Sequence, residues 1–164
     1  MINFLNTRFD NGSSFERRHG GKKMRSHALA DERMPTRSKL SALWASVMFC
    51  YVYGDYFELY VPGKLQEMLE GKMALGTVTQ GMLFGTASLM AVPGLMIFLS
   101  LVLPAMAARW LNIGAGLFYA AIMLLILLGG AWAFYMLFAA IEIALTLLVV
   151  GYAWRWPRTP EPSA

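Results

Sequence analysis

The chain has 164 residues, of which 57% are hydrophobic and 15% charged, and its mean hydropathy is +0.49. Soluble domains are less apolar and about a quarter charged, so this composition argues against a soluble enzyme, a secreted disulfide-linked scaffold and a disordered protein. Residues 1–39 hold nine of the fourteen Lys and Arg residues, whereas residues 40–164 carry a slight negative excess. The sequence therefore predicts a small multi-pass membrane protein with a basic N-terminal head.

Cysteine and histidine, which often bind metals or take part in catalysis, are nearly missing from the apolar part. The single cysteine, Cys50, lies in an apolar run and is interpreted as a packing residue, and both histidines, His19 and His27, lie in the head. A zinc site, haem ligation by two histidines and a Ser-His-Asp triad are therefore not expected in the apolar part. We predict no metal site, no cofactor and no catalytic site.

The N-terminal head, residues 1–37, is polar and basic and has no sustained hydrophobic period, so it is predicted to be disordered. A basic segment directly before an apolar helix more often reports membrane orientation than nucleic-acid binding, and no nucleic-acid partner is expected. Met34 is followed by Pro35, basic residues and the first apolar run. Translation is therefore expected to begin at Met24 or Met34.

Four stretches are long enough to cross the hydrocarbon core of a bilayer, which requires about 20 mostly apolar residues. The apolar run between Trp110 and Trp154 is about twice as long as one crossing needs, and Gly129 with Gly130 is the expected break near its middle. The four predicted spans cover residues 40–61, 78–103, 110–128 and 131–154.

The basic residues indicate the orientation of these spans. With the N-terminus inside, twelve of the fourteen lie on the cytoplasmic side, and only Lys64 and Lys72 lie outside, in a 62–77 loop that is predicted to form a short surface helix. The predicted architecture is all-α: an integral membrane four-helix bundle with both termini in the cytoplasm. The membrane domain covers residues 38–157, and residues 158–164 form a short cytoplasmic tail.

Each predicted span carries a line of polar or small residues at helical spacing, which predicts a bundle with a partly polar interior. In the second span, Gly81 and Gly85 form a GxxxG pair that allows another helix to pack closely. Pro93 is expected to bend the same span and to free the carbonyl group of Leu89. The four lines are Trp44, Val47, Tyr51, Asp55 and Glu58; Thr77, Gly81, Gly85 and Ser88; Asn112, Gly116 and Tyr119; and Tyr135, Glu142 and Thr146.

Glu142 is the most informative polar residue, because it falls at the centre of the last span and no predicted span contains a Lys or Arg to pair with it. An ionised carboxylate is expensive at that depth, so Glu142 is expected to be protonated and to donate a hydrogen bond. Tyr51, Tyr119 and Ser88 lie at a similar predicted depth and are the expected partners.

Two interpretations of the carboxyl groups remain open. In the first, a series of carboxyl and hydroxyl groups conducts protons or a cation from the outer surface, as in transporters. In the second, Asp55 and Glu58 only reach the membrane interface, and Glu142 fixes helix register through a buried hydrogen bond worth roughly 1 kcal/mol. The members of the predicted path are Glu142, Asp55, Glu58, Tyr51 and Tyr119.

Residues 39–62 read KLSALWASVMFCYVYGDYFELYVP. This stretch resembles the opening of a family of small bacterial membrane proteins classed as a domain of unknown function, whose pattern begins K-L-S-x-L-W and continues Y-x-Y-x-D before a later proline. The matching positions are Lys39, Leu40, Ser41, Leu43, Trp44, Tyr51, Tyr53, Asp55 and Pro62. The resemblance covers residues 37–157 and implies a fold without an activity. The layout is more loosely similar to DoxX-like four-helix proteins, some of which are linked to membrane redox complexes.

These observations lead to three expectations about function. The first is a non-enzymatic membrane protein that acts through helix packing, as a homo-oligomer or as a small subunit beside another membrane protein in the lipid bilayer. The alternative is a proton- or cation-coupled transporter or channel that uses Glu142 and Asp55. The third is a quinone-linked redox subunit. A catalytic role is not expected, because no nucleophile–base pair is visible in the sequence.

Overall fold

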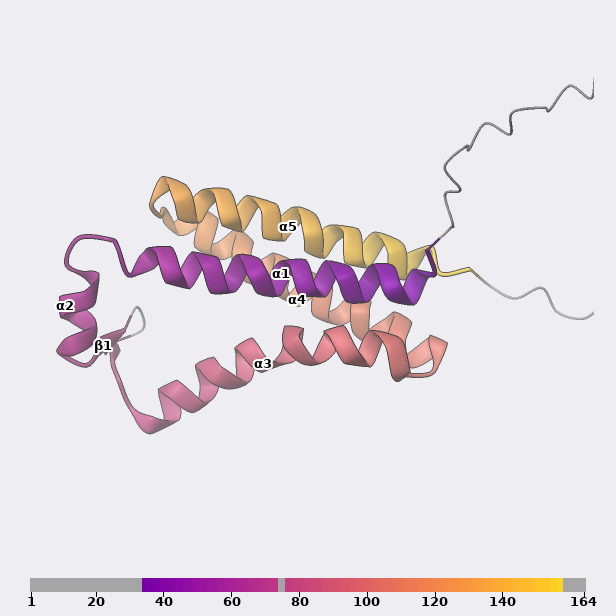
Figure 1. The fold of residues 1–164 in the computed structure, drawn as a ribbon, viewed down its shortest axis with the longest axis horizontal. Helices are drawn as coiled ribbons and strands as arrows, with labels where there is room; N and C mark the ends of the chain where they lie inside the picture. The colour runs from indigo at the N-terminus through magenta and orange to yellow at the C-terminus, as the bar shows by residue number, and fades with distance from the viewer. Residues whose placement is uncertain (1–33, 74–75, 158–164) are drawn as a thin grey trace, which may run out of the picture. The chain divides into compact units, whose positions relative to one another are not determined.

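The computed structural model describes residues 34–73 and 76–157, and this part of the chain is mostly helical (Figure 1). Its elements are α1 (Thr36–Glu58), α2 (Lys64–Leu69), β1 (Lys72–Met73), β2 (Gly76–Thr77), α3 (Gln80–Val102), α4 (Ala105–Gly129) and α5 (Ala133–Trp154). Residues 1–33 and 158–164 lie outside the described residues, so the predicted disorder of the head and the predicted tail stay predictions. The helix α1 begins at Thr36, inside the predicted head.

Three helices, α3, α4 and α5, are long and apolar enough to cross a membrane. Large apolar side chains such as Phe98, Leu125 and Leu137 are exposed on them, at 61%, 70% and 61% of their surface. Soluble monomers seldom expose large continuous apolar patches, so the structure indicates a membrane protein. The described chain has five helices instead of four, because the short α2 forms in the 62–77 loop where a surface helix was predicted.

The four long helices alternate in direction, so that the start of α1 and the end of α5 lie at the same end of the bundle (Figure 1). The helix α1 packs against α3 and α5, and α4 packs mainly against α5. Buried residues on α1 recur every three or four positions, which places one helix face in the core. These residues are Leu40, Trp44, Val47, Tyr51 and Gly54.

The closest helix contact that a glycine makes in the bundle involves Gly116 and not the GxxxG pair. A Cβ atom added to Gly116 would lie 2.8 Å from Val150 Cγ2 and 3.1 Å from the carbonyl oxygen of Thr146, so α4 and α5 touch at this position. A Cβ atom at Gly81 or Gly85 would meet no atom within 4 Å. The polar line of the second span was predicted to face the interior, and this is wrong. A contact of Gly81 and Gly85 with another molecule stays a prediction.

The helix α3 bends near its middle, as predicted for Pro93 (Figure 1). None of its residues before Pro93 is buried, whereas Met96 and Ser100 after it are. Because proline has no N–H group, the carbonyl group of Leu89 lacks its helical donor, and the hydroxyl of Tyr119 on α4 donates to it at 2.5 Å. The bend carries the first half of α3 away from the core and explains why its polar residues are not in the interior.

Two arginines cap helix ends at the end of the bundle where α1 begins. Arg37 Nη1 donates hydrogen bonds to the carbonyl oxygens of Leu101, at 2.7 Å, and Leu103, at 2.6 Å, where α3 ends. Arg109 Nη2 donates to the carbonyl oxygen of Trp154 at 3.3 Å, at the end of α5. The last carbonyl groups of a helix have no partner within it, so these bonds stabilise the turns between the helices.

The α2 helix and the antiparallel β1–β2 hairpin lie at the opposite end (Figure 1). Lys64 forms an ion pair with Glu58 at 2.6 Å and so joins α2 to the end of α1. Lys72 donates a hydrogen bond to Glu70 at 2.8 Å. This bond, with a weaker one from Gln66, holds the pKa of Glu70 below its ordinary value.

Several helix boundaries differ from the predicted spans. The helix α4 begins at Ala105 and not near residue 110, because the preceding Pro104 has a backbone angle suited to a helix start. The helix α1 ends at Glu58 and not at residue 61. The predicted break between the last two long helices is confirmed: α4 ends at Gly129, and Gly130 adopts a φ of 77°, which favours glycine.

Candidate functional site

A cavity of about 510 Å³ lies between the second half of α1, α2, the hairpin, α3 and α5. Its polar lining consists of Asp55, Tyr56, Glu58, Lys64, Thr86 and Tyr135. Its apolar lining consists of Val52, Leu59, Met68, Met73 and Met90. We call it the carboxylate cavity, because two acidic side chains of one helix form part of its wall.

Helical spacing brings the two acidic residues of α1 together, since Asp55 and Glu58 are three residues apart and lie on one side of the helix. Glu58 is paired with Lys64 of α2. Asp55 forms no ion pair with any other residue that the structure describes. The lining therefore contains two carboxylates and one ammonium group, and the uncompensated negative charge belongs to Asp55.

Glu142 lies deeper in the bundle, on α5, and only 3% of its surface is exposed. It is two helical turns from Tyr135, on the same face of α5. Asp55 is near enough to Glu142 for their charges to interact, and Tyr135 is near enough to interact with both carboxyl groups and with Glu58. Tyr135 thus lies in the lining of the cavity and on the same face of α5 as the buried carboxyl group.

Tyr51 lies one helical turn further into the bundle than Asp55 and is 6% exposed. Its hydroxyl group is buried and has no hydrogen-bond partner among the described residues. It lies near enough to Glu142 and Tyr135 for electrostatic interaction. A buried polar group without a partner costs free energy, so such groups are rare unless they serve a function or bind water.

The structure brings most members of the predicted path into one region. These are Glu58 and Asp55 at the cavity, and Tyr51 and Glu142 behind it. Tyr119 has a different role, because its hydroxyl donates to the carbonyl group of Leu89.

The prediction that Glu142 forms a hydrogen bond with Tyr51, Tyr119 or Ser88 is wrong. The Tyr51 hydroxyl has no partner in the part of the chain that the structure describes, the Tyr119 hydroxyl donates elsewhere, and Ser88 is exposed. Tyr135 was predicted to share a helix face with Glu142 but was not among the predicted members of the path. Its spacing of seven residues from Glu142, which puts both on one helix face, is the signal that identifies it.

A second buried polar cluster, which we call the Asn112 network, joins α1, α3 and α4. Trp44 Nε1 donates to Asn112 Oδ1 at 2.7 Å, and Asn112 Nδ2 donates to the carbonyl oxygen of Ala108 at 2.7 Å. Ser100 Oγ lies 2.7 Å from the Met96 carbonyl oxygen and 3.1 Å from Asn112 Oδ1. The side-chain groups in it are bonded to one another or to backbone, which indicates a structural role.

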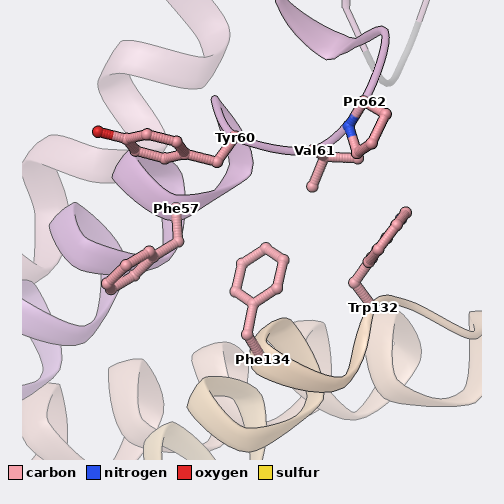
Figure 2. A pocket seen from close by; sticks show the side chains of 6 residues that line it. All are labelled: Phe57, Tyr60, Val61, Pro62, Trp132 and Phe134. Atoms are coloured by element: carbon pink, nitrogen blue, oxygen red, sulfur yellow. The ribbon is translucent and has the colours of Figure 1, made fainter.

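A smaller cavity, of about 220 Å³, lies where α1 ends and α5 begins (Figure 2). Its lining is Phe57, Tyr60, Val61, Pro62, Trp132 and Phe134. The Tyr60 hydroxyl points away from the other lining side chains (Figure 2). It shares a hydrogen bond with the hydroxyl of Tyr56 at 2.8 Å. The lining offers rings for stacking and, in Trp132, an indole N–H group that can donate a hydrogen bond, and the quinone-linked alternative stays a prediction.

In the described ranges, no group of three or more His, Cys, Asp or Glu side chains is arranged to hold a metal ion. The carboxylate cavity is lined by carboxyl, hydroxyl and ammonium groups. These groups can hold, release and pass protons, or attract a cation.

Residues 30–161 match the model of a protein family described as a family of unknown function, DUF6326. No curated protein and no solved structure matches the chain. The match includes every described helix and extends beyond the 37–157 range predicted from the sequence motif. The resemblance to a family of unknown function is confirmed, whereas the likeness to DoxX-like proteins stays a prediction. The chain belongs to the DUF6326 family of unknown function.

Proposed function

We propose that this protein crosses the bacterial inner membrane four times, with both termini in the cytoplasm, and moves protons through the carboxylate cavity. The fourth crossing is α1, whose 23 residues extend about 35 Å and pack between α3 and α5. The orientation is supported by Arg37 and Arg109, which lie at the end of the bundle that holds the start of α1 and the end of α5.

The observation that carries this proposal is the series of acidic and hydroxyl groups between the cavity and Glu142. Asp55 and Tyr135 line the cavity, and both lie within electrostatic reach of Glu142, whose side chain is buried. Tyr51, one helical turn from Asp55, adds a buried hydroxyl that has no partner among the described residues. Carboxyl groups inside a membrane domain are expensive, and they occur in the proton and ion pathways of pumps and transporters.

Proton flux into liposomes tests the proposal. The full chain is reconstituted with a pH-sensitive dye inside, and a potassium diffusion potential drives protons inward. We expect the wild type to acidify the lumen, and we expect Glu142→Gln to lower that rate roughly tenfold or more, because it removes the titratable group in the interior. Asp55→Asn is expected to lower the rate as well.

The matched control is Glu67→Gln, which removes a carboxyl group from exposed α2 that does not line the cavity. This variant is expected to conduct protons like the wild type. Equal flux in the wild type and in Glu142→Gln, with both proteins folded and inserted, would contradict the proposal.

A second candidate function is the packing role: a non-enzymatic subunit that binds a second copy or another membrane protein. One observation favours it, namely that Gly81 and Gly85 face open space in the described chain, so a helix of another molecule has room to pack there. This candidate predicts no proton flux that depends on Glu142. The flux measurement therefore distinguishes the two functions.

A further inference from the structure

We propose that the carboxylate cavity binds a lipophilic organic cation, meaning a molecule with one positive charge and an apolar body. The inference rests on the proposed function, because it names what the same cavity takes up. The volume of about 510 Å³ falls within the range of small-molecule sites and is far larger than a bare inorganic ion needs. The size of the cavity thus indicates a molecular ligand.

The charge of the lining indicates the sign of the ligand. Lys64 neutralises Glu58 at 2.6 Å, whereas Asp55 lines the same cavity and forms no ion pair with another described residue. Asp55 is exposed at the cavity, where its carboxylate attracts a partner of opposite charge. One uncompensated negative charge matches a ligand with one positive charge.

The remaining lining indicates the body of the ligand. Tyr56 and Tyr135 contribute aromatic rings, which attract organic cations through the ring face. Met68, Met73 and Met90 come from α2, β1 and α3, and their flexible side chains adapt to apolar groups of different shape. A small hydrated metal cation would gain little from these contacts, whereas alkyl or aryl groups bury apolar surface in them.

Access to the cavity fits a ligand that dissolves in lipid. Val52 and Leu59 line the cavity and are 58% and 41% exposed, so its rim belongs to the apolar outer surface of the described chain. The half of α3 before Pro93 borders the cavity at Thr86 and Met90 and contains no buried residue. A lipophilic cation in the outer part of the bilayer can therefore reach the cavity from the side.

Titration calorimetry of the full chain in lipid nanodiscs tests this inference with tetraphenylphosphonium as the probe. Tetraphenylborate, which has nearly the same size and shape but a negative charge, is the control for partitioning into lipid. We expect saturable binding of the phosphonium ion and none of the borate ion. Asp55→Asn is expected to weaken phosphonium binding by about tenfold or more, because it removes the counter-charge. Glu67→Gln, which changes a carboxyl group outside the lining, is expected to bind like the wild type.

The inference is overturned if the two probes interact alike with the wild type, or if folded Asp55→Asn binds phosphonium as tightly as the wild type does. The comparison of the two probes needs only wild-type protein, so it tests the proposed cation binding even if a variant does not fold. The proton-flux test contains no organic cation. Flux that depends on Glu142 without phosphonium binding refutes the ligand class alone, and phosphonium binding without such flux refutes the proposed proton transport alone.

Discussion

Replacing Gly116 by leucine is expected to lower the stability of the bundle far more than replacing Gly114 by leucine in the same helix. The added Cβ at Gly116 would lie 2.8 Å from Val150 and 3.1 Å from the backbone oxygen of Thr146. A backbone atom cannot rotate away, so α4 must shift from α5 along much of their contact. Overpacking of this kind costs about 3 kcal/mol, and a leucine adds further atoms to the clash.

The control position Gly114 has no atom within 4 Å of the added Cβ, so leucine there is expected to change stability little. The measurement is the thermal unfolding midpoint of both variants in the same detergent, followed by circular dichroism. A similar midpoint for both variants would show that α4 and α5 are not in close contact at Gly116.

Replacing Asn112 by leucine is expected to cost about 2 kcal/mol of unfolding free energy, because the buried N–H group of Trp44 loses its acceptor. Ser100 keeps the Met96 carbonyl group as an acceptor, so the main loss is at Trp44. The leucine side chain has as many heavy atoms as that of asparagine, so little cavity formation is expected.

Ser46→Ala is the matched control for Asn112→Leu, because the Ser46 hydroxyl donates to the Ala42 carbonyl oxygen on an exposed part of α1. The loss of this exposed hydrogen bond is expected to change the free energy of unfolding by less than about 0.5 kcal/mol. The measurement is equilibrium unfolding in mixed micelles, monitored by tryptophan fluorescence. Equal stability of Asn112→Leu and the wild type would show that the Asn112 network does not stabilise the bundle.

Much of the bundle follows from local features of the sequence. Apolar length predicts the three apolar helices, and the spacing of three or four residues predicts the buried faces of α1 and α4. The glycine pair at 129–130 ends a helix because Gly130 adopts a positive φ. These features depend on residues close together in the chain, and sequence patterns report such features well.

The position of α3 and the role of the basic residues depend on contacts between distant residues. Pro93 predicts a bend and a free carbonyl group, but it does not say how far the first half of α3 moves from the core. Arg37 reads as an orientation signal, whereas its bonds to Leu101 and Leu103 cross more than sixty residues. No local pattern encodes such pairs.

In the candidate site too, the sequence predicts features that depend on nearby residues but not features that depend on distant ones. The spacing of Asp55 and Glu58 places them on one side of α1, and the position of Glu142 in the middle of an apolar run makes it conspicuous. The cavity itself exists because α2 folds back so that Lys64 meets Glu58, and because α3 bends away. Pro93 predicts a free carbonyl group at Leu89. The sequence gives no sign that the Tyr119 hydroxyl donates to this carbonyl and so is not the partner of Glu142.

The central claim is that protons reach Glu142 from the carboxylate cavity, and infrared spectroscopy of the full chain in lipid tests it most directly. The spectrum of Glu142→Gln is subtracted from that of the wild type to isolate one carboxyl band, and the difference is followed from about pH 5 to pH 9. The account predicts that this band changes between its protonated and ionised positions within the range and shifts in D₂O. A band that stays protonated throughout and does not exchange in D₂O would contradict it, because Glu142 would then be a sealed structural residue.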